Sequence, residues 1–277
     1  MNTWRIMLAH HLAHLNPTLT TGTAVAGYPI GSLRTLNPQE RGRVTSASTN
    51  LVIDWDRGAN GNHNPIDALL LVGQCNIATA AYEVYSDTAS DFPTPLKYLD
   101  DGSNAFDSIV PRMCLFTTTG AGAELASTIE RYMRMAILAA GDDTYDFGVI
   151  SMGKQHLLGT DLYAGASESA ESGAALGGEG SRIITRSFDD VTDANAAAIL
   201  AAWRKDSIMD TANAYVDGWG QKAGQRFGAL AKFSSATAVT SDEVYYGNIN
   251  LTVEPKYEGK SQVNVQVRTV EVGPIQT

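Results

Sequence analysis

The residues of this chain best suited to chemistry are a histidine cluster near its start and four pairs of acidic residues. The cluster reads His10-His11-Leu12-Ala13-His14. On a helix, His10 and His14 would share one face, as in a zinc-protease helix, but that motif also needs a Glu beside the first His as general base. His11 occupies that position, and no further His or carboxylate follows at a supporting spacing. We therefore predict no metal site and expect the histidines to lie at a partner interface.

The acidic pairs are candidates for general acid and base catalysis. They are Asp54/Asp56, Asp100/Asp101, Asp142/Asp143 and Asp189/Asp190. Acidic residues this close together usually cap or solvate a turn. A glycosidase needs two carboxyl groups that face one cleft from different strands, and a calcium loop needs EF-hand spacing, which is absent. The pairs therefore favour structural roles.

Glycine-rich stretches give no complete nucleotide-binding motif. Gly120-Ala121-Gly122 lacks the third glycine of a dinucleotide loop, and Gly177-Gly178-Glu179-Gly180 lacks the Lys-Ser/Thr of a P-loop. No Gly-x-Ser-x-Gly nucleophile elbow occurs. We therefore predict that the protein is not an enzyme and that it uses no cofactor, no metal and no catalytic residue.

The composition and net charge of the chain limit the kinds of partner that it can bind. The 277 residues carry a net charge of −10, with 18% charged and 44% hydrophobic residues. Lys and Arg occur as scattered singlets, which argues against nucleic acid or an anionic membrane as partner. No apolar run approaches 18 residues, so we expect no membrane span. The apolar stretch at the N-terminus is too short and too polar for a secretory signal. We expect Cys75 and Cys114 to be buried thiols in a reducing cytoplasm. A disulfide between them remains an open alternative.

The elements that must position these residues are mostly strands. Short apolar runs alternate with Gly, Asn, Asp and Ser, as in Leu51–Asp56, Ala68–Gly73 and Tyr132–Ile137. The pattern predicts a mainly β fold, an antiparallel jelly roll or β-sandwich. One docked α-helix is expected at about 192–206, because Thr192 can cap it and an apolar face repeats at helical spacing. Residues Ile199, Leu200 and Trp203 should bury that face.

The chain divides into three predicted parts. Residues 1–163 are expected to form a jelly-roll-like domain, whose N-terminal part is a candidate partner-contacting arm. Residues 164–181 are small and polar, which predicts a flexible loop or linker. Residues 182–277 should form a strand-helix-strand region that completes or extends the β body.

The order of segments resembles tail-tip proteins of long-tailed bacteriophages, the distal-tail or minor tail proteins with a galectin-like jelly roll. The matching segments cover about residues 30–255. They are Gly31–Arg41, Ile53–Asp56, Ile66–Ile77, Glu130–Met135, Phe147–Gly153, the helix from Asp193 and Tyr246–Ile249. Departures occur at Gly148-Val149, where the family has Gly-Arg, and at 164–181.

The resemblance implies a structural protein of the virion tail tip or baseplate, made in the host cytoplasm. It implies a homo-oligomeric ring that joins the tail tube to the hub or fibres, and it brings no catalytic residues. Trp219, Arg226 and Arg41 are interface candidates, because Trp and Arg are enriched at binding hot spots. Packing within one subunit is the open alternative for each of them.

A different class remains open beside the tail protein. The same jelly-roll scaffold could serve as a carbohydrate-binding or receptor-binding adhesin module, with an aromatic and several polar side chains on one sheet face. An enzyme such as a glycosidase or esterase is the third alternative.

Overall fold

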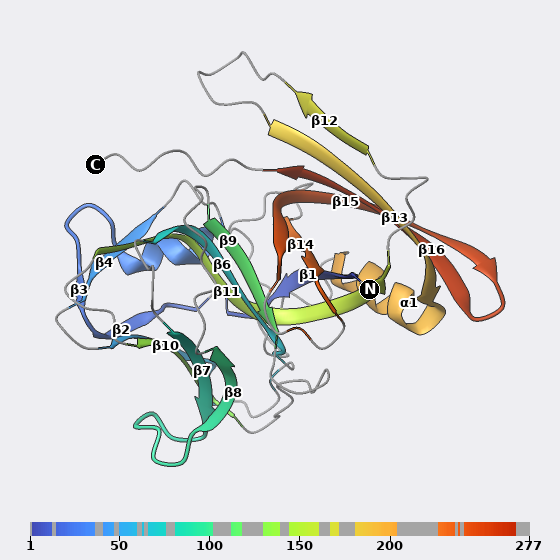
Figure 1. Ribbon diagram of the computed structural model, residues 1–277. Coiled ribbons are helices and arrows are strands. Elements are labelled where there is room, and N and C mark those ends of the chain that lie inside the picture. The colour runs from blue at the N-terminus through green and yellow to red at the C-terminus, as the bar shows by residue number, and fades with distance from the viewer. Residues whose placement is uncertain are drawn as a thin grey trace.

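The computed structural model describes residues 2–12, 15–36, 41–46, 50–59, 63, 66–75, 81–101, 112–117, 130–138, 144–160, 167–171, 181–203, 227–235, 238 and 241–269. Across them the protein is mainly β, with two antiparallel sheets forming a sandwich and one short α-helix (Figure 1). The elements are β1 (Thr3–His10), β2 (Thr18–Thr21), β3 (Thr23–Ala24), the 3-10 helix η1 (Ile30–Thr35), β4 (Gly42–Thr45), β5 (Leu51–Asp56), β6 (Ala68–Cys75), β7 (Ala81–Asp87), β8 (Leu96–Asp101), β9 (Arg112–Thr117), β10 (Tyr132–Leu138), β11 (Thr144–Gly159), β12 (Ser167–Glu171), β13 (Ser181–Thr192), α1 (Asp193–Trp203), β14 (Phe227–Phe233), β15 (Glu243–Tyr257) and β16 (Lys260–Thr269).

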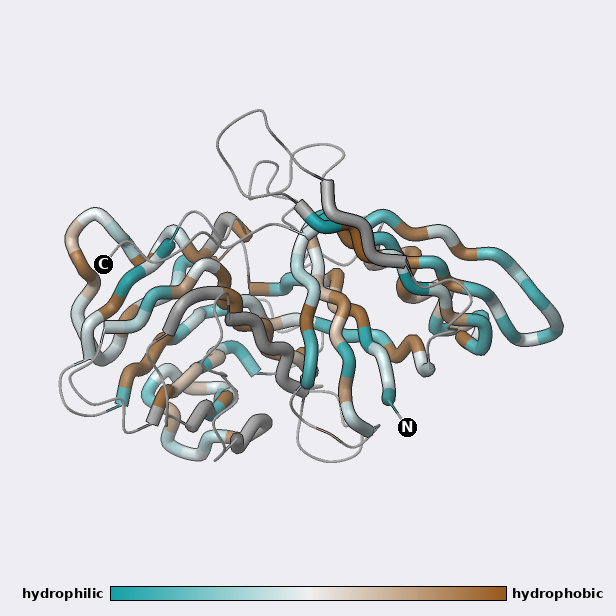
Figure 2. Tube along the Cα trace, turned by 45° about the horizontal axis from the view of Figure 1, so that its top comes forward, coloured by the Kyte–Doolittle hydropathy of each residue, from teal (hydrophilic) through white to brown (hydrophobic). Residues whose placement is uncertain are grey.

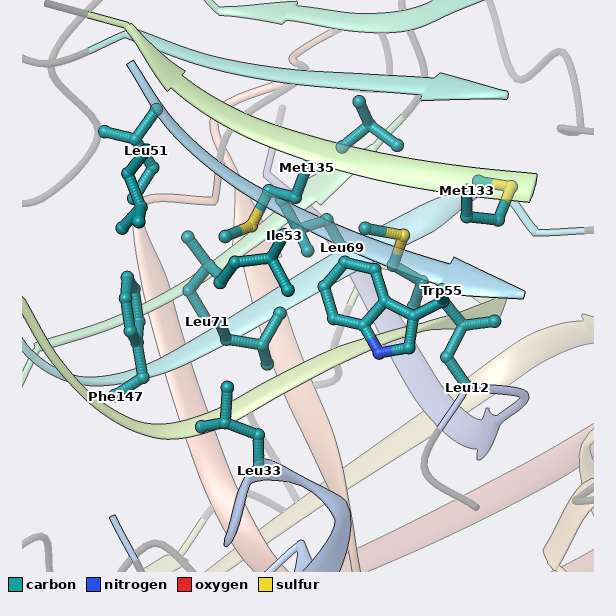
Figure 3. Close-up of a cluster of buried hydrophobic side chains, with 14 of the residues drawn as sticks. Leu12, Leu33, Leu51, Ile53, Trp55, Leu69, Leu71, Met133, Met135 and Phe147 are labelled. Atoms are coloured by element: carbon teal, nitrogen blue, oxygen red, sulfur yellow. The ribbon is translucent and has the colours of Figure 1, made fainter. Parts of the chain in front are cut away.

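The sandwich is formed by a five-stranded sheet and part of an eleven-stranded sheet. The smaller sheet has the order β2-β5-β10-β7-β8, and its core partners are strands β4, β6 and β11. Side chains from both sheets fill the space between them, with Trp55 and Met133 facing Leu69 and Leu71 (Figure 3). Burial of this apolar surface is the main force that holds the two sheets together.

Alternation of residue types determines which face of the smaller sheet is buried. Along β5, Leu51, Ile53 and Trp55 are buried, whereas the residues between them are at least partly exposed. Because side chains of a strand alternate between its two faces, Asp54 and Asp56 must point away from the core. The sequence therefore dictates that both carboxylates lie on the outer face.

Strand β11 joins the sandwich to the second half of the eleven-stranded sheet. Its first half pairs with β4 and β6, and its second half, Gly153–Gly159, pairs with β1. The sheet continues through β14, β15 and β16 to β13 and β12. The two halves of the molecule therefore share one hydrogen-bonded sheet, in which a long β15–β16 hairpin alternates hydrophobic and hydrophilic residues (Figure 2).

Helix α1 packs against this second half of the sheet. Thr192 caps it, since the backbone N–H of Asn195 donates to the Thr192 hydroxyl at 3.3 Å. Ala196, Ile199 and Ala202 are buried in a cluster that includes side chains of β1, β11, β13, β14, β15 and β16. The predicted helix is confirmed over Asp193–Trp203, and residues 204–206 lie outside the described residues.

Leu200 and Trp203 were expected to be buried, but both are only half-buried. Trp203 nevertheless anchors the end of the helix. Its indole N–H donates to the Ile249 carbonyl at 2.9 Å. We predict that Trp203→Ala lowers the free energy of unfolding by about 3 kcal/mol, because it removes this hydrogen bond and a large packed ring. Urea unfolding measures the loss, and Ala197→Ser on the exposed side of the helix is the matched control. Equal stability of both variants would contradict the docking.

Two parts of the predicted division differ from the structure. The N-terminal residues do not form an arm: β1 lies inside the sheet between β11 and β14, with Trp4 and Ile6 buried. Within 164–181, Ser167–Glu171 form β12, which pairs with β13, and Ser181 begins β13. Residues 164–166 and 172–180 lie outside the described residues. The apolar alternation of β1 and the small residues of β12 are both compatible with strands. The pairing partners of β1 are remote in sequence, whereas β12 pairs with β13, the next strand in the chain.

The backbone register separates the two cysteines. Cys114 lies opposite Leu71 on the neighbouring strand, and Cys75 lies four residues further along β6. At roughly 3.3 Å per residue this separates their Cα atoms by more than about 13 Å, beyond the 7 Å limit of a disulfide. The pairing that the sequence left open is therefore incompatible with this register.

The described residues include no helix that could cross a membrane. Helix α1 has 11 residues, and none of the described helices combines the length and the apolar character that a span requires.

Candidate functional site

The outer face of the five-stranded sheet carries a polar ladder of four charged residues, Asp54, Asp56, Arg131 and Arg134. The carboxylates come from β5, and the two arginines come from β10 and the residue before it. Strand β10 lies between β5 and β7, and Arg134 is opposite Asp54 in the register. The pairing of two strands about 80 residues apart therefore builds the ladder.

The Arg134–Asp54 pair is the more buried half of the ladder. Arg134 Nε and Nη2 donate to Asp54 Oδ1 and Oδ2 at 2.7 and 2.8 Å, a bidentate arrangement. The Thr20 hydroxyl, from β2, donates to Asp54 Oδ2 at 2.5 Å. The guanidinium also lies over the Phe92 ring, with its central carbon 4.0 Å from the ring centroid. Four segments of the sheet and its loops therefore fix the position of one guanidinium.

The loop between β7 and β8 is shaped to place Phe92 on Arg134. Asp87 ends β7 and accepts hydrogen bonds from the backbone N–H groups of Ala89 and Thr94, at 3.0 and 3.1 Å. Phe92 has a φ of 52°, a left-handed conformation that bulky residues rarely adopt. Such a backbone persists only where its surroundings stabilise it, which here are the Asp87 hydrogen bonds and the contact with Arg134.

The Arg131–Asp56 pair is the open half of the ladder. Arg131 Nε and Nη2 donate to the two carboxylate oxygens of Asp56, both at 2.6 Å, and the Gly58 N–H donates to Oδ1 at 2.8 Å. The Arg131 side chain is 36% exposed and that of Asp56 46%, compared with 23% and 18% for Arg134 and Asp54. The hydrogen bond from Arg131 lowers the pKa of Asp56, which keeps this carboxylate ionised.

The pairing leaves one nitrogen of each guanidinium unused. Both arginines bind their carboxylate through Nε and Nη2, so Nη1 with its two N–H groups has no hydrogen-bond partner in the described part of the chain. Tyr132 lies beside Arg131, with the guanidinium carbon 4.9 Å from its ring centroid, and it is half-buried. The open half of the ladder therefore offers hydrogen-bond donors next to an aromatic ring.

This arrangement suits recognition better than proton transfer. A glycosidase needs one carboxyl group with a raised pKa as general acid, whereas the pKa of Asp56 is lowered. Each carboxylate is held by a guanidinium on a rigid strand, so the ladder is fixed and nearly neutral. These are properties of a preorganised binding surface.

Of the three interface residues predicted from the sequence, the structure describes Arg41, which is not part of the ladder. Arg41 is in an ion pair with Asp146 of β11, with Nη1 3.4 Å from Oδ2 and its side chain 14% exposed. Arg43 contacts the same carboxylate at 2.9 Å, so Arg41 belongs to a cluster within the subunit. Trp219 and Arg226 lie outside the described residues, and their predicted role stays a prediction.

The histidines are also not where the sequence placed them. His10 lies in a strand, not a helix, and both His10 and His11 are buried, so the expected partner interface is wrong for these two. His10 Nε2 lies 3.1 Å from the Phe227 carbonyl and must donate to it, so Nδ1 accepts from the Ser151 hydroxyl at 2.8 Å. No group of three His, Cys, Asp or Glu side chains suited to a metal occurs within the described ranges.

Sequence reasoning found Asp54 and Asp56 but missed their arginine partners. The available signal was the alternation Asp-x-Asp in one strand and Tyr-x-Arg at the start of another, which puts each set on one face. Only the order of strands in the sheet brings the two sets together.

Comparisons with known proteins find solved structures with a similar fold but assign the chain to no family. No known family profile matches the chain, and no curated protein matches it. Among solved structures, it is similar to chitosan-binding module 1 from a chitosanase/glucanase of Paenibacillus sp. IK-5, with 15% identity over 52% of this chain and 100% of that chain and a TM-score of 0.38.

Two further solved structures match to a similar extent. One is CBM32-1 from a family 31 glycoside hydrolase of Clostridium perfringens, with 13% identity over 50% of this chain and 94% of that chain and a TM-score of 0.35. The other is the lectin domain of lectinolysin complexed with Lewis B antigen, with 10% identity over 52% of this chain and 96% of that chain and a TM-score of 0.36. These similarities are too low to carry an argument about what this chain binds. None of these three solved structures is a phage tail protein.

Proposed function

We propose that the protein is a structural component of a bacteriophage tail tip or baseplate, where it forms part of a ring between the tail tube and the hub or fibres. The observation that carries the proposal is the ordered resemblance described above, because its segments coincide with framework elements. Ile53–Asp56 lies in β5, Ile66–Ile77 contains β6, Phe147–Gly153 lies in β11 and Tyr246–Ile249 lies in β15. The resemblance therefore concerns the elements that build the fold.

The distribution of exposed apolar side chains supports a role in assembly. The large hydrophobic residues exposed in the described part of the chain are Leu96 (56%), Leu157 (51%) and Tyr257 (59%). Leu96 begins β8 of the smaller sheet, whereas Tyr257 ends β15 at the tip of the long hairpin, and these elements lie well apart (Figure 1). A ring of identical subunits uses two different patches on each subunit, which agrees with such a separation.

Deletion of the gene from a phage genome tests this function. We expect heads that fill with DNA but tails that lack a functional tip or fail to assemble, visible by negative-stain electron microscopy. Supply of the protein in trans should restore normal tails and is the control. Infective particles with normal tails in the absence of the protein would refute a structural role.

The second candidate function is a carbohydrate-binding or receptor-binding adhesin module. The observation that favours it is the polar ladder, in which the Arg131 guanidinium has N–H groups without a hydrogen-bond partner among the described residues and lies beside Tyr132. The two functions are compatible with each other, because a tail-tip component can also carry a glycan-binding site.

A further inference from the structure

We propose that the open half of the polar ladder, around Arg131 and Asp56, binds a neutral carbohydrate. The inference rests on the second candidate function, for which it names the ligand class and the binding residues, and it does not depend on the role in tail assembly. The inference rests on three properties of the site. They are compensated charge, guanidinium N–H groups beside an aromatic ring that have no hydrogen-bond partner within the described ranges, and preorganisation by paired strands.

Charge selects against an anionic ligand. Each guanidinium of the ladder is already paired in bidentate fashion with a carboxylate, and the protein as a whole carries a charge of −10. A phosphate or sulfate group would have to displace Asp56 or Asp54, or approach them closely. A neutral ligand meets no such barrier, so the compensated pairs favour hydroxyl groups over anions.

The hydrogen-bonding groups at the surface match a polyhydroxylated ligand. The Nη1 atoms of Arg131 and Arg134 present donors, and sugar hydroxyl oxygens can accept from them. The Arg131 guanidinium lies over the half-buried Tyr132 ring. A sugar bound at Arg131 would contact the part of the ring that the guanidinium leaves uncovered. The exposed side chain of Thr20, whose hydroxyl donates to Asp54, borders the same face.

Preorganisation lowers the entropic cost of binding. Arg134 is fixed by Asp54 and Phe92, and Arg131 by Asp56, so neither side chain must be ordered by the ligand. Exposure also restricts the site to one end of the face. Ala136 and Glu83, farther along the same face, are buried, whereas Arg131 and Asp56 are open.

Calorimetry and a glycan array test the proposal with the full chain. The probe is an array of neutral oligosaccharides that includes cellotriose, maltotriose, lactose and N-acetylchitotriose, with heparin as the anionic comparison. We expect saturable binding to at least one neutral glycan, with an affinity that changes little between 50 and 500 mM NaCl. If the protein binds none of the neutral glycans, or binds only heparin with a steep salt dependence, the proposal is overturned.

Matched variants locate the site. Arg131→Gln removes the Nη1 donors and should weaken binding at least tenfold, while the exposed pair contributes little to stability. Lys232→Gln breaks a comparably exposed ion pair with Glu243, on the other sheet, and should leave binding unchanged. Equal affinity of wild type and Arg131→Gln would overturn the assignment, provided that both melt at similar temperatures.

The same variant separates glycan binding from tail assembly. A phage that carries Arg131→Gln should form normal tails if the ladder serves a glycan. Failure of those tails to assemble would show instead that the ladder contacts another tail protein, and it would overturn the glycan assignment without refuting the structural role.

Discussion

Replacement of Phe147 by Ala is expected to lower the free energy of unfolding by about 3–5 kcal/mol, the range for truncation of a fully buried aromatic residue. Phe147 lies on β11, is 0% exposed and packs in the cluster between the two sheets (Figure 3). Its removal leaves a cavity that the surrounding strands cannot fill, because each is held by hydrogen bonds to its neighbours. Urea unfolding monitored by circular dichroism measures the loss.

Leu157→Ala is the matched control for this prediction. Leu157 is on the same strand, but its side chain is 51% exposed. Its truncation should change stability by less than about 0.5 kcal/mol, since surface substitutions rarely do more. If the two variants unfold at the same urea concentration, the sheets do not pack across β11 as described.

Acidification from pH 7 to about 4 is expected to destabilise the protein by several kcal/mol. Burial lowers the pKa values of His10 and His156 from 6.5 to about 4 each, because it disfavours the charged ring. Between pH 6.5 and 4 the unfolded chain binds protons on these residues that the folded chain does not bind. Stability therefore falls with pH across this window by up to about 3 kcal/mol for each histidine, and this contribution levels off below pH 4.

Two carboxyl groups with shifted pKa values change this profile in opposite directions. Burial raises the pKa of Asp67, so its protonation in the folded state offsets part of the loss as the pH falls. The pKa of Asp56 is lowered from 3.8, so its stabilising ion pair is lost only below that value. The acid loss above pH 4 is therefore assigned to the histidines.

Glutamine variants assign the acid sensitivity to each histidine. The amide of His10→Gln supplies one donor and one acceptor, as the neutral ring does for Phe227 and Ser151. Both His10→Gln and His156→Gln should show a shallower loss between pH 7 and 4.5 than wild type, whatever their stability at pH 7. A wild-type free energy of unfolding that is constant over this range would contradict the lowered pKa values.

Local sequence patterns predicted the elements of this fold well. The alternation in Leu51–Asp56 marked β5 at its observed bounds, and the run beginning at Tyr132 marked β10 within one residue. Thr192 and the apolar repeat after it marked α1. These predictions succeeded because strand alternation and helix capping depend on residues close together in the chain.

The candidate site was only half visible in the sequence. The spacing of Asp54 and Asp56 put both on one face, but nothing near them in the chain identified Arg131 and Arg134 as partners. Arg41, chosen because arginine is common at interfaces, belongs to an ion pair within the subunit. Residue type alone does not distinguish an anchor for a partner from one for the protein's own fold.

The sequence by itself determined which segments form strands, which face of each strand is apolar, and that one helix interrupts them. Tertiary structure alone decided which strands are neighbours. It placed β1 beside β14, more than 200 residues away, and it turned two isolated acidic residues into a ladder with two arginines. The physical reason is that strand pairing depends on backbone hydrogen bonds and on burial shared by remote segments, and neither is encoded in any short stretch of chain.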